Sequence, residues 1–267
     1  MPHWEFPGTE PIDLDVRLTS GKIVITAEPT EMITVDIQSS PSSWFGDDYP
    51  DELLVEYADG CLRITEPPVH GWLRQGSLDI AIKVPAGSRG SVNSTAADLV
   101  CTGELGSLDL RTVSGDIKAE TATGDLQITT TSGRVRVEHA ARSVTAKSAS
   151  GAIGLGRVGG DVNITTVSGR VQIAVAEAAA TIRTATGRVR VDSLARGLAE
   201  IGTVSGDIGV DIAPGIGVYL DLSSLSGRVS SELEPSGADE QADLQLRCRS
   251  ISGSLRVGRA VLADVKG

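Results

Sequence analysis

Apolar and polar residues alternate with period two through most of the chain, and the alternation restarts at regularly placed glycines. The repeating element is Gly-x-φ-x-φ, where φ is usually aliphatic, as in GDIKA from Gly115 and GRVQI from Gly169. Alternation of this kind, rich in Val, Ile and Leu, is typical of short β-strands with one buried face. The pattern therefore predicts an all-β protein with almost no helix.

A hydroxyl residue followed by glycine marks every second restart, and we call these glycines the landmark glycines. They are separated by 18, 18, 18, 18, 19, 21 and 26 residues. The set is Gly115, Gly133, Gly151, Gly169, Gly187, Gly206, Gly227 and Gly253. A weaker restart lies about halfway between the early landmarks, so each interval holds two short strands. The spacing predicts a parallel β-solenoid (β-helix) with about 18 residues per coil.

Each coil should bury the φ residues two and four positions after its landmark glycine. The apolar residue two positions before the glycine has the same parity, so we expect it and the glycine to face inward as well. The hydroxyl residues one and three positions before the glycine have the opposite parity. We expect them to form hydrogen-bonded ladders along the solenoid. In this interpretation the repeat residues build the coil and perform no chemistry.

The two ends depart from the regular period. Residues 1–90 are predicted to form an N-terminal β cap region with the first strands, and residues 91–267 the β-solenoid repeats. An aromatic and acidic segment in the first part contains Trp44, Phe45 and Tyr49. It is either a contact site or a plug over the first coil. The tail after the last repeat should blunt the C-terminal edge.

Charge and cysteine usage narrow the partners. The formal net charge is −11 and the pI about 4.8, which argues against nucleic acid, because phosphate binding needs a positive field. Cys61, Cys101 and Cys248 cannot all pair within one chain and are expected to be reduced. No signal peptide and no membrane-spanning apolar run is recognisable, so we expect a cytoplasmic protein, with leaderless export as the alternative.

The outward positions of the two strand rows differ in charge. The row after the landmark glycines carries Lys118, Arg134, Arg136, Arg170, Arg188, Arg190 and Arg228. The opposite row carries Asp109, Asp125, Asp161 and Glu200. The five candidate contact residues of the basic row are Arg134, Arg136, Arg170, Arg188 and Arg190. They form either a stripe for an acidic ligand or self-docking, or a solvated surface whose arginine stems cover the strands.

Motifs for catalysis, cofactors and metals do not fit this architecture. Gly154, Gly156 and Gly159 match GxGxxG, but no helix follows, so we expect no dinucleotide. Arginine directly after several landmark glycines disfavours a calcium-binding β-roll, since Ca²⁺ needs oxygen ligands. We therefore expect no catalytic, cofactor or metal site. The chain is predicted to be a non-enzymatic binding module for a protein or glycan ligand.

Two alternatives stay open at this point: a scaffold that associates end to end, and a carbohydrate-active enzyme. The TVSGDI, TTSGRV and TVSGRV repeats, preceded by PIDLDVRLTSGKIVITA, resemble the bacterial "putative adhesin" family, a domain of unknown function. That resemblance implies a β-helical fold and a role in adhesion or envelope-related sensing, and it supplies no catalytic residues. The Gly-x-φ-x-φ pattern is also similar to that of bactofilins, β-helical scaffolds that polymerise end to end.

Overall fold

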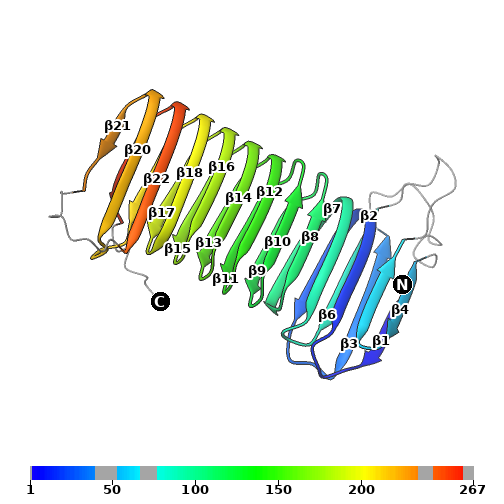
Figure 1. Ribbon diagram of the computed structural model, residues 1–267. Helices are drawn as coiled ribbons and strands as arrows, with labels where there is room; N and C mark the ends of the chain where they lie inside the picture. The colour runs from blue at the N-terminus through cyan, green and yellow to red at the C-terminus, as the bar shows by residue number, and fades with distance from the viewer. Residues whose placement is uncertain (1, 40–52, 67–76, 234–242, 261–267) are drawn as a thin grey trace. The chain divides into compact units, whose positions relative to one another are not determined.

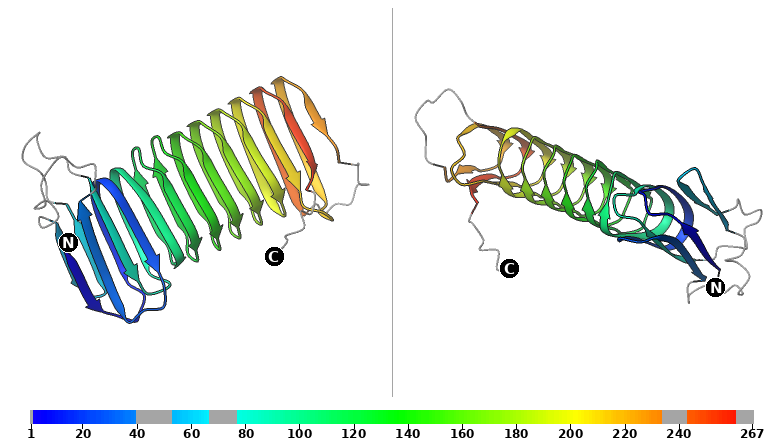
Figure 2. Two further views of the ribbon diagram at one scale, coloured as in Figure 1. Left: turned by 180° about the vertical axis from the view of Figure 1, so that it is seen from behind. Right: turned by 90° about the horizontal axis from the view of Figure 1, so that it is seen from below.

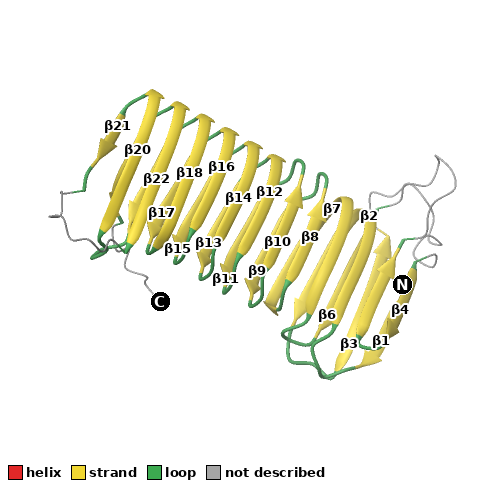
Figure 3. Cartoon of the chain, in the orientation of Figure 1, coloured by secondary structure: helices red, strands yellow, loops and turns green. Residues whose placement is uncertain are grey.

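The computed structural model describes residues 2–39, 53–66, 77–233 and 243–260. Within these ranges every regular element is a strand, as Figure 3 shows. The all-β prediction is therefore confirmed. The chain divides into two compact units, Met1–Ala141 and Arg142–Gly267, which we describe separately. The expected division near residue 90 stays a prediction.

The first unit begins with long strands that each pass through two walls. β2 pairs in parallel through its first half with β5 and through its second half with β6, and β7 pairs with both halves of β2. The later coils of this unit are split into two short strands each. The strands are β1 (His3–Pro7), β2 (Asp13–Ala27), β3 (Met32–Ser39), β4 (Leu54–Ala58), β5 (Cys61–Thr65), β6 (Leu78–Val84), β7 (Arg89–Leu105), β8 (Leu108–Thr112), β9 (Ile117–Ala122), β10 (Leu126–Thr130) and β11 (Val135–Ala140).

Antiparallel strands close the N-terminal end of the first unit. β3 runs antiparallel to β6, β1 antiparallel to β3, and β4 antiparallel to β5. The rings of Phe6 on β1 and Tyr57 on β4 pack with their centroids 5.1 Å apart. An aromatic contact of this kind contributes about 1 kcal/mol beyond the area it buries. The predicted N-terminal β cap is confirmed, and it ends the parallel stack with strands of a different orientation.

The second unit consists of coils with two strands each (Figures 1 and 2). We call the row before the landmark glycines the pre-glycine wall and the row after them the post-glycine wall. The pre-glycine strands are β12 (Val144–Ser150), β14 (Val162–Ser168), β16 (Ala180–Thr186), β18 (Gly197–Ser205), β20 (Val218–Ser226) and β22 (Leu244–Ser252). The post-glycine strands are β13 (Ile153–Val158), β15 (Val171–Ala176), β17 (Val189–Leu194), β19 (Ile208–Ile212), β21 (Val229–Ser231) and β23 (Leu255–Arg259). Pairing within each wall is parallel, which confirms the predicted β-solenoid.

Stacked aliphatic columns form the core. Val171, for example, lies between Ile153 and Val189 in exact strand register, and all three are buried. The landmark glycines lie where adjacent coils approach most closely. A Cβ on Gly169 would lie 1.9 Å from the carbonyl oxygen of Gly151, and its φ is +148°. Only glycine fits there, so the prediction that the φ residues face inward and that the turn needs glycine is confirmed.

The expected parity before the landmark glycines is wrong. The hydroxyl residue three positions before the glycine is buried in every coil except that of Ser224, and the residue two positions before the glycine is exposed in every coil except that of Ala185; these two residues are half-buried. In some coils the buried hydroxyl group bonds to the turn itself: Gly115 N–H donates to Thr112 Oγ1 at 3.1 Å, and Thr166 Oγ1 donates to the Ser168 carbonyl at 3.4 Å. The hydroxyls of Thr130, Ser148, Thr203 and Ser250 face inward without a hydrogen-bond partner, so this bond is not the general cause of the reversed parity.

The expected ladders of hydroxyl groups are replaced by bonds to the backbone. The Ser114 hydroxyl donates to the Thr95 carbonyl of the neighbouring coil at 3.4 Å, and the Thr186 hydroxyl to the Val167 carbonyl at 3.3 Å. Both donors lie directly before a landmark glycine. The hydroxyls at this position therefore tie each turn to the main chain of its neighbour.

The coils at the C-terminal end do not stack in sequence order. β22 pairs with β18 on one side and with β20 on the other, and β23 lies between β19 and β21 in the same way. Figure 1 shows β22 inserted between β18 and β20. The last coil of the sequence is therefore second from the end in space. The tail expected to blunt this edge, from residue 261 on, lies outside the described residues.

Candidate functional site

The aromatic segment predicted as a contact site or plug cannot be placed in the fold. Trp44, Phe45 and Tyr49 fall in the range 40–52, outside the described residues. The five candidate arginines are described, and they belong to different units: Arg134 and Arg136 to the first, and Arg170, Arg188 and Arg190 to the second.

In the first unit the two arginines lie among carboxylates. Arg134 is 4.0 Å from Asp116, and its backbone N–H donates to the same side chain at 2.8 Å. Arg136 is next to Lys118 in strand register, and Lys118 reaches Glu138 at 4.0 Å. Arg134 and Lys118 are thus each offset by an acid of an adjacent coil. This arrangement favours a solvated surface at these positions.

In the second unit the arginines are also interrupted by acids. Arg170 and Arg188 occupy neighbouring turns, as predicted, because the Val171 N–H donates to the Arg188 carbonyl one coil further on. Arg188 is 3.9 Å from Asp207.

Arg190 contacts two carboxylates. It lies 2.7 Å from Asp192 and is also paired with Asp211. The hydrogen bond to Asp192, together with the charges of Asp211 and Asp192, raises the pKa of Arg190. The basic row therefore does not form a continuous positively charged surface.

A different column of the second unit is exposed and apolar. It consists of the residues two positions before each landmark glycine, and we call it the aliphatic ladder. In spatial order it comprises Ala149, Val167, Ala185, Val204, Ile251 and Leu225. Val167 is 60% exposed, Val204 51%, Ile251 52% and Leu225 84%. Such a row in strand register gives the pre-glycine wall one continuous apolar edge.

The same wall carries an arginine cluster beside the ladder. Arg183, Gly202 and Arg249 follow one another in register on β16, β18 and β22. Arg247 is two residues before Arg249 on β22 and beside Glu200 on β18. Together with Ile201 these residues line a hollow of about 270 Å³, which we call the arginine notch. The prediction of an acidic row on this wall is therefore wrong for the second unit, because the outward columns of the wall also hold these arginines.

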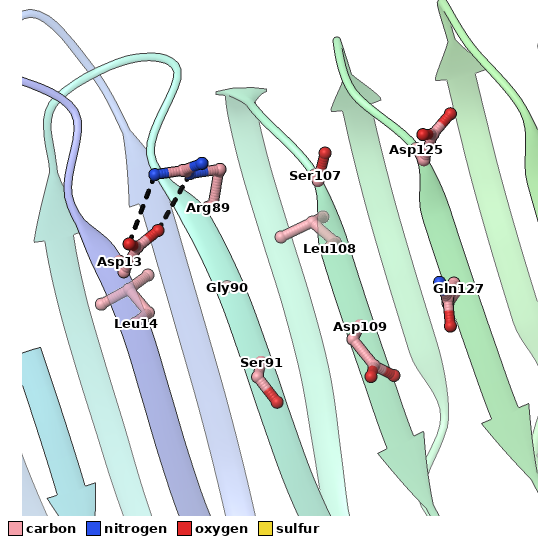
Figure 4. A pocket seen from close by; sticks show the side chains of 10 residues that line it. All are labelled: Asp13, Leu14, Arg89, Gly90, Ser91, Ser107, Leu108, Asp109, Asp125 and Gln127. Atoms are coloured by element: carbon pink, nitrogen blue, oxygen red, sulfur yellow. Dashed lines mark hydrogen bonds and ion pairs between the residues drawn. The ribbon is translucent and has the colours of Figure 1, made fainter. Parts of the chain in front are cut away.

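The first unit has its own surface hollow of about 430 Å³ on β2, β7, β8 and β10, drawn in Figure 4. Gly90 lies between Leu14 and Leu108 in strand register, and a Cβ built on it would lie 3.3 Å from Leu108 Cδ2, so the leucine side chains already fill the space beside it. Two of the three carboxylates that line the hollow are held by arginine, the first being Asp13, which lies 2.9 Å from Arg89.

The second acid of this hollow is held in the same way, since Asp109 lies 2.7 Å from Arg111. Two carboxylates bound in this way favour a structural role over acid–base chemistry.

Neither a cluster of metal-ligating side chains nor a membrane-spanning helix occurs in the part of the chain that the structure describes. There, no group of three or more His, Cys, Asp or Glu side chains could hold a metal ion. Nor does a helix long and apolar enough to cross a membrane occur in those residues. Burial raises the pKa of Cys101 and of Cys248 to about 12, which keeps both thiols protonated at neutral pH.

A family model described as Toastrack DUF4097 matches residues 12–264. The chain belongs to this family. The family has no assigned function, and the match confirms the resemblance that the repeats indicated. None of the curated proteins matches the chain.

Solved structures with similar folds include a "putative adhesin" from Bacteroides fragilis, at 12% identity over 96% of both chains with a TM-score of 0.47. Another "putative adhesin", from Parabacteroides distasonis, has 12% identity over 96% of both chains and a TM-score of 0.40. A "putative lipid binding protein" from the same species has 10% identity over 96% of both chains and a TM-score of 0.32. At these values the likeness carries no functional argument.

The ladder and the notch were both missed at the sequence level, although a signal for each exists. Residues four positions before the landmark glycines include Arg183, Gly202 and Arg249, so the notch is one column of the repeat. The alternating arginines of LRCRS, from Leu246, mark its far side. The columns themselves can be read at fixed offsets from the glycines, but the turn parity that exposes the ladder and the coil order that assembles the notch cannot.

Proposed function

We propose that the chain is a non-enzymatic binding module that holds a protein or glycan partner against the aliphatic ladder of its second unit. The observation that carries this proposal is the exposure of Val167, Val204, Ile251 and Leu225 in one strand-registered column. Exposing an apolar row of this kind to water is unfavourable. A partner that covers it gains about 25 cal/mol for each Å² of apolar surface removed from water.

The scaffold beneath the ladder supports this role. Val167, Val204 and Ile251 each lie next to a buried hydroxyl residue whose backbone is paired in parallel on both sides, as at Thr203. The column is therefore rigid, and binding costs little ordering entropy. The first unit offers a natural comparison, since the same position there holds Thr95, Val113 and Thr131 and is mostly polar.

The test is a protein and glycan array probed with labelled wild-type protein, with the double variant V204T/I251T and with the control V113T. Threonine keeps the β-branched shape, so all three proteins should melt alike. We expect wild type and control to share at least one ligand that the double variant binds about tenfold or more weakly, because two apolar contacts are lost. Ligand binding that is equal in all three proteins would refute the ladder as the contact surface. Turnover of an arrayed glycan would refute the non-enzymatic role.

A second candidate, end-to-end self-association, is favoured by the terminal coil. In the described part of the chain β20 and β21 pair on one side only, with β22 and β23. Leu220 and Leu222, which occupy core columns, are half-buried, and Val229 is 44% exposed. Stacking a second copy on this coil would bury them.

Sedimentation velocity over a hundredfold range of concentration tests this second candidate. Association that rises with concentration and is lost in L222D would support it. A sharp monomer at all concentrations would dismiss it.

A further inference from the structure

We infer that the arginine notch is a binding site for one tetrahedral oxyanion, the phosphate or sulfate ester group of a ligand. This goes beyond the proposed function, because it assigns a charged group to a site that the aliphatic ladder does not include. It would stand even if the ladder proved to have no partner.

The geometry of three consecutive coils creates the notch. Neighbouring parallel strands are about 4.8 Å apart, so the main chains of Arg183 and Arg249 are separated by about 10 Å. Gly202 occupies the strand between them, and a Cβ built on it would meet no atom within 4 Å. The two long side chains thus flank an open space that is floored by backbone. Guanidinium groups on both sides can donate to the oxygens of a single anion.

The charge balance of the notch favours an anion. Three guanidinium groups line it against one carboxylate, that of Glu200. Among the described residues Arg183 has no acidic partner. Arg247 lies 3.5 Å from Glu200, and Arg249 lies 3.7 Å from Asp221. These contacts are long and partly exposed, so each holds its arginine weakly. The notch therefore has an excess of positive charge that a bound anion would offset.

The position of Gly202 gives the sharpest test. Its φ lies outside the left-handed region and the space above it is free, so threonine fits the strand without strain. G202T should therefore fold normally and fill the notch. Gly217, whose Cβ position is also open and which lies outside the notch, provides the matched control G217T.

The experiment is an NMR titration of the full chain with inorganic phosphate and, separately, inorganic sulfate at constant ionic strength. It follows the Gly202 amide and the arginine Nε–Hε signals. We expect saturable shifts with a dissociation constant on the order of millimolar, since each charge-assisted hydrogen bond contributes modestly at a surface. G202T should abolish the shifts, whereas G217T should bind like wild type.

Charge variants provide a second readout. R183Q/R249Q should bind about tenfold or more weakly than wild type, because two charge-assisted hydrogen bonds are lost. The control is R256Q. Arg256 lies on the post-glycine wall, where it pairs with Glu232, so its replacement should leave anion binding at the notch unchanged. Phosphate that binds more tightly at pH 7.5 than at pH 5.5 would indicate that the site prefers the dianion of a phosphate ester. Sulfate that binds more tightly than phosphate at both pH values would indicate a sulfate ester.

Two results would overturn the inference. The first is the absence of saturable shifts with either anion, or shifts that sodium chloride reproduces at equal ionic strength. The second is binding that persists unchanged in folded G202T. Neither result would bear on the array test of the aliphatic ladder, so the two proposals fail separately.

Discussion

An aspartate placed in the core column of the post-glycine wall should destabilise the second unit severely. Val171 is fully buried between Ile153 and Val189. In V171D the new carboxyl would be protonated in the native state, and protonating a group of ordinary pKa 3.9 at pH 7 costs about 4 kcal/mol. The unpartnered acid adds about 1–3 kcal/mol, and the lost aliphatic burial about 1.5–3 kcal/mol. A loss of about 7–10 kcal/mol is comparable to the whole stability of many domains.

The pH dependence separates this cause from simple loss of packing. The native state of V171D binds a proton that the unfolded state releases above pH 3.9, so its free energy of unfolding should rise as the pH falls. Between pH 7 and pH 5 the variant should regain about 2.7 kcal/mol relative to wild type. Urea unfolding with hydrogen exchange over residues 153–191 measures both quantities.

The control places the same residue on the outside. In T165D the aspartate lies on β14 between Lys147 and Arg183, so the change in stability should stay within about 0.5 kcal/mol. A native melting temperature for V171D, or a loss that does not change between pH 7 and pH 5, would refute the inward assignment.

Further predictions concern the turns and the thiols. G169A should lose about 3 kcal/mol or more, measured by urea unfolding, because its Cβ would meet a carbonyl at 1.9 Å with φ at +148°. In the native protein at pH 8 iodoacetamide should modify Cys61 and spare Cys101 and Cys248, whose pKa burial raises to about 12; mass spectrometry in urea should show all three modified. Above about pH 9 these two thiols ionise in the unfolded state but stay protonated in the native state up to about pH 12. Each thiol should therefore lower the free energy of unfolding by about 1.4 kcal/mol for every unit by which the pH rises from 9 to 12.

The fold could be predicted because one physical rule repeats in the sequence. Val171 and Ile173 follow their landmark glycine at positions two and four, and both are buried, as are their counterparts in every coil except the terminal one, where Val229 is exposed. Alternation fixes which residues of a strand share a face. Alternation does not fix which residues face inward on the other side of a turn. There Thr166 lies inward and Val167 outward, which reverses the expected sides.

The order of the coils and the candidate site could not be predicted from the sequence, for a related reason. The repeat defines a coil but not its neighbour, so nothing marks β22 as the strand that inserts between β18 and β20. The arginine notch depends on that insertion, because it brings Arg249 next to Gly202 although 47 positions of sequence separate them. The aliphatic ladder likewise needs the turn parity before its exposure can be seen.

Engineered disulfides test most directly the central claim that the aliphatic ladder is an outward column with Ile251 inserted between Val204 and Leu225. In a Cys61→Ser background, V204C/I251C places cysteines on adjacent parallel strands about 4.8 Å apart, within disulfide range, whereas V204C/L225C separates them by about 10 Å. After mild oxidation, peptide mapping without reduction should show the 204–251 bond and no 204–225 bond. A 204–225 bond without the 204–251 bond, or no bond in either variant, would contradict the account.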